Sequence, residues 1–275
     1  TPASVAGQLE GQLLAMIMSH IGLVHALCNR CLRQRHWEQI SATVGFPIEP
    51  DHAFTLNRLN DMEVGKHMDR LRDISEAATK EHAIEKLLDA MEAEWQPVGL
   101  QLEPFRETGV SVVTGSSVRE MRALLEDHLG KTRGMRESPY VEPLVSRVIE
   151  WEDWLSVAVR ILDFWTRLQA AWTSLEPVFS AHDLLRQMPT ECLLFRQADV
   201  SWRHLVHLVE EQPAALQLTQ LPGLLEELGD CCNRLDEVQE GLQDYLCSKG
   251  LALPGCSGLP GTPTGGALAV EVVER

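Results

Sequence analysis

The stretch from Ser138 to Pro177 constrains the fold more than any other part of the chain. Its apolar residues recur at steps of three and four, which is the period of a helix with one buried face. They stand at positions 141, 144, 148, 151, 155, 158, 162, 165, 168, 172 and 175. Ser138 suits the N-cap and Pro139 the first helical position, and Pro177 is expected to end the helix. Because such a helix is about 55 Å long, the sequence predicts the spine of an elongated helical protein.

Composition narrows the class of protein further. The chain has 275 residues, of which 44% are hydrophobic and 23% charged, a balance typical of folded proteins. A net charge of −16 disfavours nucleic acid as a partner. The apolar stretch Leu13–Cys28 follows no basic region, is interrupted by His20 and His25, and is too short to cross a bilayer, so neither a signal peptide nor a membrane partner is expected. Seven cysteines scattered over expected helices suit a reducing compartment.

The same periodicity divides the rest of the chain into helices. We expect them over 5–42, 63–95, 117–135, 190–211 and 223–247, with a short helix after Ser180 and a break at 44–50. Residues 54–62 are ambiguous, and Pro213 and Pro222 bracket a loop. The helix over 117–135 is expected to begin at a capping box formed by Ser117 and Glu120.

One region breaks the helical pattern. Apolar residues alternate over 98–102, and a second Val-rich run over 110–113 follows a turn at Gly109, so a β-hairpin is expected at about 98–113. The predicted fold class is therefore mostly α, with elongated bundles of long amphipathic helices and one small β-hairpin in a single helical region over 1–248. Residues 249–275 are rich in Gly and Pro and are expected to form a disordered tail.

A fragment of a phosphate-binding motif occurs at Gly130-Lys131-Thr132. A P-loop also needs a glycine five residues earlier, where Leu125 stands, and a strand before the loop, where the helical segment Met121–Leu129 stands. The backbone cradle for a phosphate cannot form in that context, so no nucleotide is expected there.

Two patterns could in principle bind a metal. Cys28 and Cys31 form one CxxC without a second ligand pair, and without the β-α-β context of a redox motif, so incidental thiols are the favoured interpretation. His204, His207 and Glu211 could share a helix face, but no further ligand can be nominated, and a solvated face is favoured over a metal hydrolase. No catalytic, cofactor-binding or metal-binding residue is therefore predicted.

Tryptophan is more frequent than tyrosine, with seven residues against two. Trp151, Trp165 and Trp172 lie on the apolar stripe of the spine, with Trp154 beside it, and we interpret them as packing residues rather than as a ligand-binding box. The adjacent Cys231 and Cys232 are interpreted as core or surface thiols because neighbours in sequence point to different sides of a helix.

Six ordered phrases carry a resemblance to a known family. They are RQRHWEQI (Arg33–Ile40), KEHAIEKLLDAMEAEW (Lys80–Trp95), LEDHLGKTRGMRESPYV (Leu125–Val141), LDFWTRLQAAWTSLEPVF (Leu162–Phe179), MPTECLLFRQADVSWRHL (Met188–Leu205) and LDEVQEGLQDYL (Leu235–Leu246). Together they resemble the linker region of dynein heavy chains, in particular of the axonemal branch, over about residues 30–254. The His36-Trp37 pair in the first phrase is read as a packing pair.

The resemblance implies a mechanical function. In that family the linker is a curved stack of helical bundles that lies across a ring of ATPase modules and bends as ATP is hydrolysed. It implies as partners the ATPase ring and the intermediate and light chains, contact with microtubules only through the full-length parent, ATP and Mg only in that parent, and a location in the cytoplasm, cytoskeleton and cilium axoneme. We expect bending near the hairpin at 98–113 or the loop at 43–52. The alternative is a static helical scaffold that binds other proteins along its faces.

The match ends near the C-terminus. Relatives continue with a Lys-Arg-x-x-Phe-Pro-Arg-Phe phrase, of which only Lys249, Leu251, Ala252 and Pro254 fit. No Walker B acid, stalk or microtubule-binding tip is present in the sequence. The chain is therefore expected to be a fragment or truncated form that neither hydrolyses ATP nor walks alone.

Overall fold

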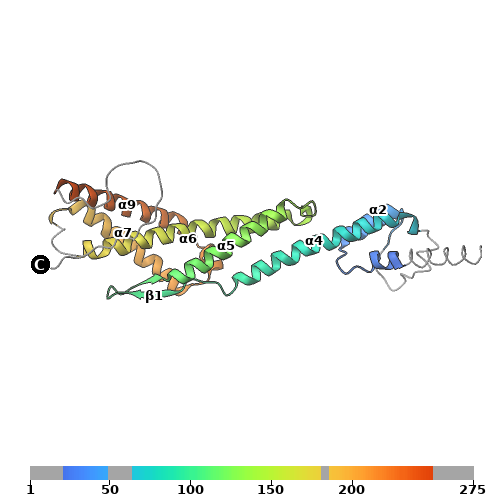
Figure 1. Ribbon diagram of the computed structural model, residues 1–275, viewed down its shortest axis with the longest axis horizontal. Helices are drawn as coiled ribbons and strands as arrows, with labels where there is room; N and C mark the ends of the chain where they lie inside the picture. Colours follow the sequence, from blue (N-terminus) through green and yellow to red (C-terminus); the bar gives the residue numbers. More distant parts are fainter. Residues whose placement is uncertain (1–20, 49–63, 181–185, 250–275) are drawn as a thin grey trace, which may run out of the picture.

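The computed structural model of the chain is long and narrow (Figure 1). It describes residues 21–48, 64–180 and 186–249. The ambiguous segment at 54–62, most of the short helix expected after Ser180 and all but the first residue of the expected tail therefore lie outside the described residues. What is described is mostly helical with one two-stranded antiparallel sheet, so the predicted fold class is confirmed.

The elements follow one another in a simple order. After a helical segment at 21–27, the described residues form α2 (Gln34–Val44), the 3₁₀ turn η1 (Val64–His67), α4 (Met68–Trp95), β1 (Leu102–Phe105), β2 (Val110–Val113), α5 (Gly115–Arg136), the 3₁₀ turn η2 (Glu142–Leu144), α6 (Val145–Phe179), α7 (Pro189–Glu211), α8 (Ala215–Leu218) and α9 (Leu224–Ser248).

Helix α6 is the predicted spine. It packs against α5 on one side and α9 on the other, and α9 in turn packs against α7. Within the helix the predicted apolar stripe is the buried one: Val148, Leu155, Leu168 and Trp172 are completely buried. Its 35 residues make a rod about 52 Å long. The periodicity thus identified both the helix and the face on which the main core is built.

The predicted ends of this helix were wrong. Helix α6 begins at Val145 rather than near Ser138, because a second proline, Pro143, lies in the preceding 3₁₀ turn and lacks the N–H that a continuing helix uses. At the other end the helix passes through Pro177 and stops at Phe179. In the last turn the proline costs few hydrogen bonds, and the Phe179 ring stacks on Phe195 with centroids 5.1 Å apart.

Two further boundaries differ from prediction. The single helix expected over 5–42 is interrupted at 28–33, where Asn29 turns its amide toward α4 and donates to the Ser75 carbonyl at 2.9 Å. Helix α5 begins at Gly115 because the hydroxyl of Thr114, not that of Ser117, caps it and accepts from the Ser117 backbone N–H. Helix α4 itself begins at Met68, after the turn η1, rather than at 63.

The hairpin is present, but its first strand is displaced. The strand β1 covers Leu102–Phe105 rather than 98–102, and Gly99 instead pairs with Ala214 beside α8, inside the segment expected to be a loop. A side chain at 99 would meet the Pro213 carbonyl oxygen at 2.5 Å, so this close backbone approach requires glycine.

The described residues bury two separate apolar clusters. The larger one is the core of α5, α6, α7, α9 and the hairpin, and it includes Leu88, Met91 and Trp95 at the end of α4. The smaller one joins the segment 21–27, α2 and the start of α4, and is formed by Leu23, Ala26, Leu27, Trp37, Ile40, Ile48, Val64 and Leu71. Helix α4 runs from one cluster to the other (Figure 1).

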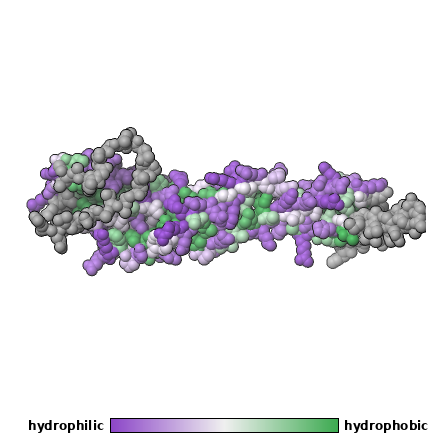
Figure 2. Space-filling model, in the orientation of Figure 1, coloured by the Kyte–Doolittle hydropathy of each residue, from purple (hydrophilic) through white to green (hydrophobic). Residues whose placement is uncertain are grey.

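The surface is predominantly hydrophilic along its length, with only small hydrophobic areas on the face shown in Figure 2. None of the described helices has the length and apolar character of a bilayer span.

Candidate functional site: the waist of helix α4

The middle of α4 differs from its two ends. Leu71, Ser75 and Ala78 are buried toward the smaller cluster, and Leu88, Met91 and Trp95 toward the larger one. From 79 to 87, no residue of the helix is buried. We call this segment, residues 79–87, the waist. Apart from the partly buried Ile84, which packs against the larger cluster, the two clusters are joined at the waist by one helix and by polar contacts.

The start of α2 makes polar contacts with the N-terminal half of the waist. The buried ring of His36 accepts the Arg33 backbone N–H on Nδ1 at 3.0 Å. The ring proton therefore lies on Nε2, which is 3.0 Å from Glu81 Oε2 on α4. Arg35 donates through Nε to the same carboxylate oxygen at 3.0 Å. One half-buried carboxylate thus receives both an imidazole and a guanidinium, which makes it the main polar link between α2 and α4.

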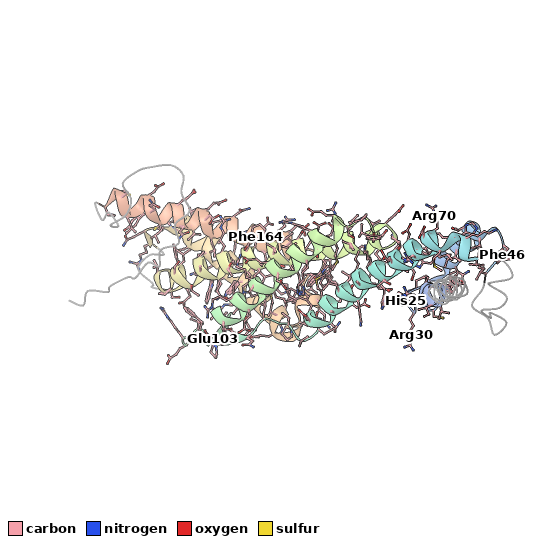
Figure 3. All side chains as sticks on the ribbon, turned by 45° about the vertical axis from the view of Figure 1, so that its right-hand side comes forward. His25, Arg30, Phe46, Arg70, Glu103 and Phe164 are labelled. Atoms are coloured by element: carbon pink, nitrogen blue, oxygen red, sulfur yellow. The ribbon has the colours of Figure 1, made fainter. Side chains whose placement is uncertain are left out.

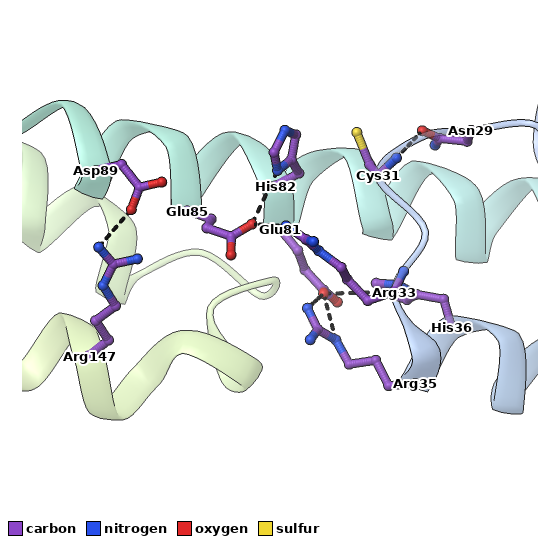
Figure 4. A network of polar contacts seen from close by, with 10 residues as sticks. All are labelled: Asn29, Cys31, Arg33, Arg35, His36, Glu81, His82, Glu85, Asp89 and Arg147. Atoms are coloured by element: carbon purple, nitrogen blue, oxygen red, sulfur yellow. Dashed lines mark hydrogen bonds and ion pairs between the residues drawn. The ribbon is translucent and has the colours of Figure 1, made fainter.

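A second, more exposed pair lies one turn further along α4. The Arg33 guanidinium is 2.6 Å from Glu85 Oε2, and His82 contacts the same oxygen at 3.2 Å. These neighbours, Arg33 foremost, lower the pKa of the Glu85 carboxyl from its ordinary value. Figure 4 shows these residues together with Asn29, whose amide also reaches Ser75 and Thr79 of α4.

Further contacts to α4 come from α6 and from the turn before it. Arg147 Nη2 is 2.6 Å from Asp89 and 2.8 Å from Glu92, both on α4, and these carboxylates, Glu92 foremost, raise the pKa of the guanidinium. In the turn between α5 and η2, the Tyr140 hydroxyl accepts from Lys80 Nζ at 3.2 Å. The polar contacts therefore continue along α4 from α2 to α6 (Figure 4).

The end of α4 is fixed in the main core by a second histidine. Trp95 Nε1 donates to Nδ1 of His128 at 3.0 Å, and His128 Nε2 is 3.1 Å from Glu94 Oε2. The Trp95 ring also meets Trp154 edge-on at 5.0 Å, and Trp154 stacks on Trp151 at 4.9 Å. The middle and the C-terminal end of α4 are thus each contacted by a buried histidine, His36 and His128, whose Nδ1 accepts a hydrogen bond and whose Nε2 faces a glutamate of α4.

The residues of the P-loop-like fragment lie inside helix α5. Lys131 Nζ pairs with Asp127 at 2.6 Å, and the buried Thr132 hydroxyl donates to the His128 carbonyl at 2.7 Å. Asp127 raises the pKa of the Lys131 ammonium, which is the direction expected of a salt-bridged surface lysine. The backbone N–H groups of Gly130 and its neighbours belong to the helix and form no cradle.

The histidines of α7 diverge. His204 Nδ1 lies 3.1 Å from Glu227 of α9, whereas His207 pairs with Glu210 and Glu211 of its own helix at 3.8 and 3.4 Å. Both are exposed, and the described part of the chain contains no group of three or more His, Cys, Asp or Glu side chains arranged to hold a metal.

The other predicted packing residues lie in the two cores. Trp151, Trp165 and Trp172 are buried and Trp154 partly so, while His36 and Trp37 are buried in the smaller cluster. Cys231 and Cys232 are both buried, and their thiols face the Ala198 carbonyl of α7 and the Phe164 carbonyl of α6, respectively, each at 3.5 Å. Figure 3 shows Phe164 on the side of the main bundle near α9.

Sequence reasoning missed the waist itself. A continuous apolar stripe along the helix expected over 63–95 would include Ile84 and Leu87, but Leu87 is 40% exposed and Ile84 is only partly buried. A usable signal was the density of charge, because Lys80-Glu81-His82 and Glu85-Lys86 leave few apolar positions there. His128 carried no such signal, since its role depends on Trp95 and Glu94, which are distant in sequence.

The described residues thus form a helical rod whose waist is held by polar pairs. Residues 3–255 match the family described as dynein heavy chain, N-terminal region 2, and the chain belongs to this family. The resemblance found in the sequence is therefore confirmed.

The relatives are axonemal. Dynein axonemal heavy chain 12 of Homo sapiens is 36% identical over 223 residues, which cover 81% of this chain and 7% of the relative. Dynein axonemal heavy chain 1 of Mus musculus is 34% identical over 235 residues, which cover 86% of this chain and 6% of the relative. Dynein axonemal heavy chain 3 of Homo sapiens is 33% identical over the same share of each. The chain thus spans a small fraction of the length of the relatives it matches.

Proposed function

We propose that this chain is a mechanical linker segment, or lever, of an axonemal dynein heavy chain. The observation that supports this function best is the waist: one continuous helix joins two apolar clusters, and no buried residue holds it over 79–87. A helix is stiff along its axis, and closely packed cores resist compression, so force applied to one cluster reaches the other through α4. Bending at the waist would disturb little apolar packing, because Ile84 is the one residue of 79–87 that packs against an apolar cluster.

The hairpin is less suited to bending than the sequence suggested. The Gln169 side chain of α6 bonds both backbone groups of Val113, at 2.8 and 2.9 Å. The Phe105 ring meets Trp172 edge-on at 5.6 Å, and the Ser111 hydroxyl donates to Glu210 of α7. Movement of the hairpin would break these contacts. Bending at the waist would instead change ion pairs that, apart from the half-buried Glu81 link to α2, are exposed and individually weak. The proposed hinge is therefore the waist.

In the full-length protein, we propose that this lever belongs to an ATP-driven, minus-end-directed microtubule motor that moves cilia. Its partners would be the dynein ATPase ring and the intermediate and light chains, and its location the cytoplasm, the cytoskeleton and the cilium axoneme. ATP and Mg would bind in the ring, and microtubules would be contacted by other parts of the heavy chain. No catalytic role is assigned to the residues of this chain.

The test is a pair of matched glycine substitutions in the full-length heavy chain. Ala83→Gly weakens the helix inside the waist by about 1 kcal/mol, and Ala90→Gly does so by the same amount where Leu88 and Met91 anchor α4. A lever transmits less displacement through a softened waist, so Ala83→Gly should lower the velocity of microtubule gliding while Ala90→Gly leaves it nearly unchanged. Equal velocities for both variants and the parent would favour the static scaffold.

A further inference from the structure

The helical segment 21–27 is apolar on two opposite faces. One face, with Leu23 and Leu27, is buried in the smaller cluster. On the other face, Ile21 and Val24 are three positions apart and are 59% and 44% exposed. Neither of them packs into the two apolar clusters of the described residues. A second apolar face on one short helix is more than its own cluster needs.

The sequence around this exposed face carries no formal charge. Between Glu10 and Arg30 there is no Asp, Glu, Lys or Arg, in a chain whose net charge is −16. The spacing of three and four continues in the sequence toward the N-terminus at Ile17 and Leu14, which lie outside the described residues. Because the solvated face of a helix is normally charged or polar, an uncharged apolar face of this kind indicates a contact surface.

The other exposed apolar pairs of the described helices share their faces with charged residues. Those on α7 and α6 are Leu193 and Val200, with Arg196 and Arg203, and Val145 and Ile149, with Glu150 and Asp153. A mixture of single apolar and charged side chains is the ordinary composition of a surface in water. The face with Ile21 and Val24 is therefore the one that calls for a partner.

The size of this face limits what can cover it. A stable interface between separate molecules buries roughly 800 Å² on each partner. Ile21, Val24 and the exposed Cys28 are too few side chains to supply this area to a second copy of the chain or to a separate subunit. A helix of the same polypeptide needs less area, because its effective concentration at the face is high.

The position of the face indicates which part of a heavy chain can reach it. The matched region covers only 6–7% of the axonemal relatives, so a heavy chain of their length has much further sequence to supply a helix. The segment 21–27 lies at one end of the rod and α9 at the other (Figure 1). Polypeptide that precedes residue 1 is attached to the segment through residues 1–20, whereas polypeptide that follows α9 is attached far from it.

We propose that the face with Ile21 and Val24 is the docking site for an amphipathic helix from the part of the heavy chain that precedes residue 1. The apolar side of this helix is uncharged, as is the face that it covers. The inference rests on the proposal that this chain is a segment of a longer heavy chain, and it does not require bending at the waist. The gliding velocities of Ala83→Gly and Ala90→Gly therefore test the lever separately.

The first test identifies the occupant by photocrosslinking in the full-length heavy chain. Benzoylphenylalanine takes the place of Ile21, and of Val200 on α7 in the matched control, and peptide mass spectrometry follows irradiation. We expect position 21 to crosslink to residues that precede this chain, in a product that migrates as a single heavy chain, and position 200 to give no such product. Crosslinks from position 21 only within this chain, only to a second heavy chain or another subunit, or none at all would overturn the proposal.

The second test compares the same substitutions in two contexts. Ile21→Gln and Val24→Gln remove the apolar side chains and keep a good helix former, and Val200→Gln is the control. In the 275-residue chain, backbone hydrogen exchange over 21–27 should hardly change, because both side chains are exposed there. In the full-length heavy chain it should become about tenfold faster in the first two variants and stay unchanged in Val200→Gln. Equal effects in both contexts, or none in the full-length chain, would overturn the proposal.

Discussion

At the scale of single residues, the buried histidines of this chain form specific polar contacts between helices. His36 and His128 are both almost completely buried, at 1% and 0% exposure. In both rings Nδ1 accepts a hydrogen bond, and Nε2 lies 3.0–3.1 Å from a glutamate oxygen of α4, although the His36 Nε2 contact lacks hydrogen-bond geometry. The cost of burying an imidazole is offset only while both partners remain, so removal of one partner leaves an unpaired buried group. His36 and His128 therefore hold the middle and the C-terminal end of α4 in a defined register against their neighbours.

The hydrogen bond between Trp95 and His128 at the end of α4 can be tested by removal of its donor. Trp95→Phe keeps an aromatic ring but leaves His128 Nδ1 without its 3.0 Å donor, so we expect a loss of about 1–3 kcal/mol beyond the effect of the smaller ring. Trp202→Phe is the matched control, because Trp202 is equally buried and its Nε1 has no partner among the described residues. Urea unfolding measures both free energies, and equal losses would contradict the assigned role of the hydrogen bond.

The thiol of Cys231 makes stability depend on alkaline pH. Burial raises its pKa from the ordinary value of 9.0 to about 12. Below pH 9 the thiol is protonated in both folded and unfolded chains, whereas between pH 9 and 12 only the unfolded chain loses the proton, so stability falls as pH rises. Cys231→Ala should flatten this decline relative to the exposed control Cys247→Ala, as measured by urea unfolding at a series of pH values. Parallel declines in the two variants would be the contrary result.

The extent to which the sequence predicts the structure is also clearest for single residues. The periodicity of apolar residues identified the stripe from Val148 to Leu175, because burial along a helix follows a period that one sequence displays. It could not identify the His128–Trp95 and His36–Glu81 contacts, because each joins residues more than 30 positions apart that share no local pattern. The helix ends failed where a local choice was decisive, as at Pro143, or where packing outweighed local preference, as at Pro177.

At the scale of elements, α4 is the part on which the account depends. It belongs to both apolar clusters, and its charged middle is held by residues from α2, from the turn before η2 and from α6. The sequence predicted a long amphipathic helix there but treated its apolar stripe as continuous. The interruption became evident only when the neighbours were known, since Leu87 is exposed because it packs against neither apolar cluster.

The polar link between α2 and α4 provides a test at this scale. Glu81→Gln removes the carboxylate that Arg35 and His36 share and should destabilise the docking of α2 by about 1.5–3 kcal/mol. Glu85→Gln removes a pair whose arginine is 50% exposed and should cost at most about 1 kcal/mol. Hydrogen exchange over α2 reports both values. A larger effect for Glu85→Gln than for Glu81→Gln would show that the shared carboxylate is not the main link.

At the scale of the whole molecule, the elongated shape and the family membership both support the proposed linker function. The chain is an elongated helical member of the dynein heavy chain family, and it matches a small part of much longer axonemal relatives. The larger cluster is formed by four long helices and by a hairpin that packs against them. The smaller cluster is joined to it through α4 and through polar contacts. Relative motion of the two clusters is the movement that the proposed lever function requires.

The most direct test of this account is the distance between the two clusters in the full-length heavy chain, measured by pulsed electron spin resonance. One spin label would replace Glu38 on the exposed face of α2, and the other Glu240 on the exposed face of α9. The account predicts two distance populations whose proportions change with the nucleotide state of the ATPase ring, and whose separation widens in Ala83→Gly but not in Ala90→Gly. A single distance, identical in every nucleotide state and in both variants, would contradict the claim that the chain is a lever with its hinge at the waist.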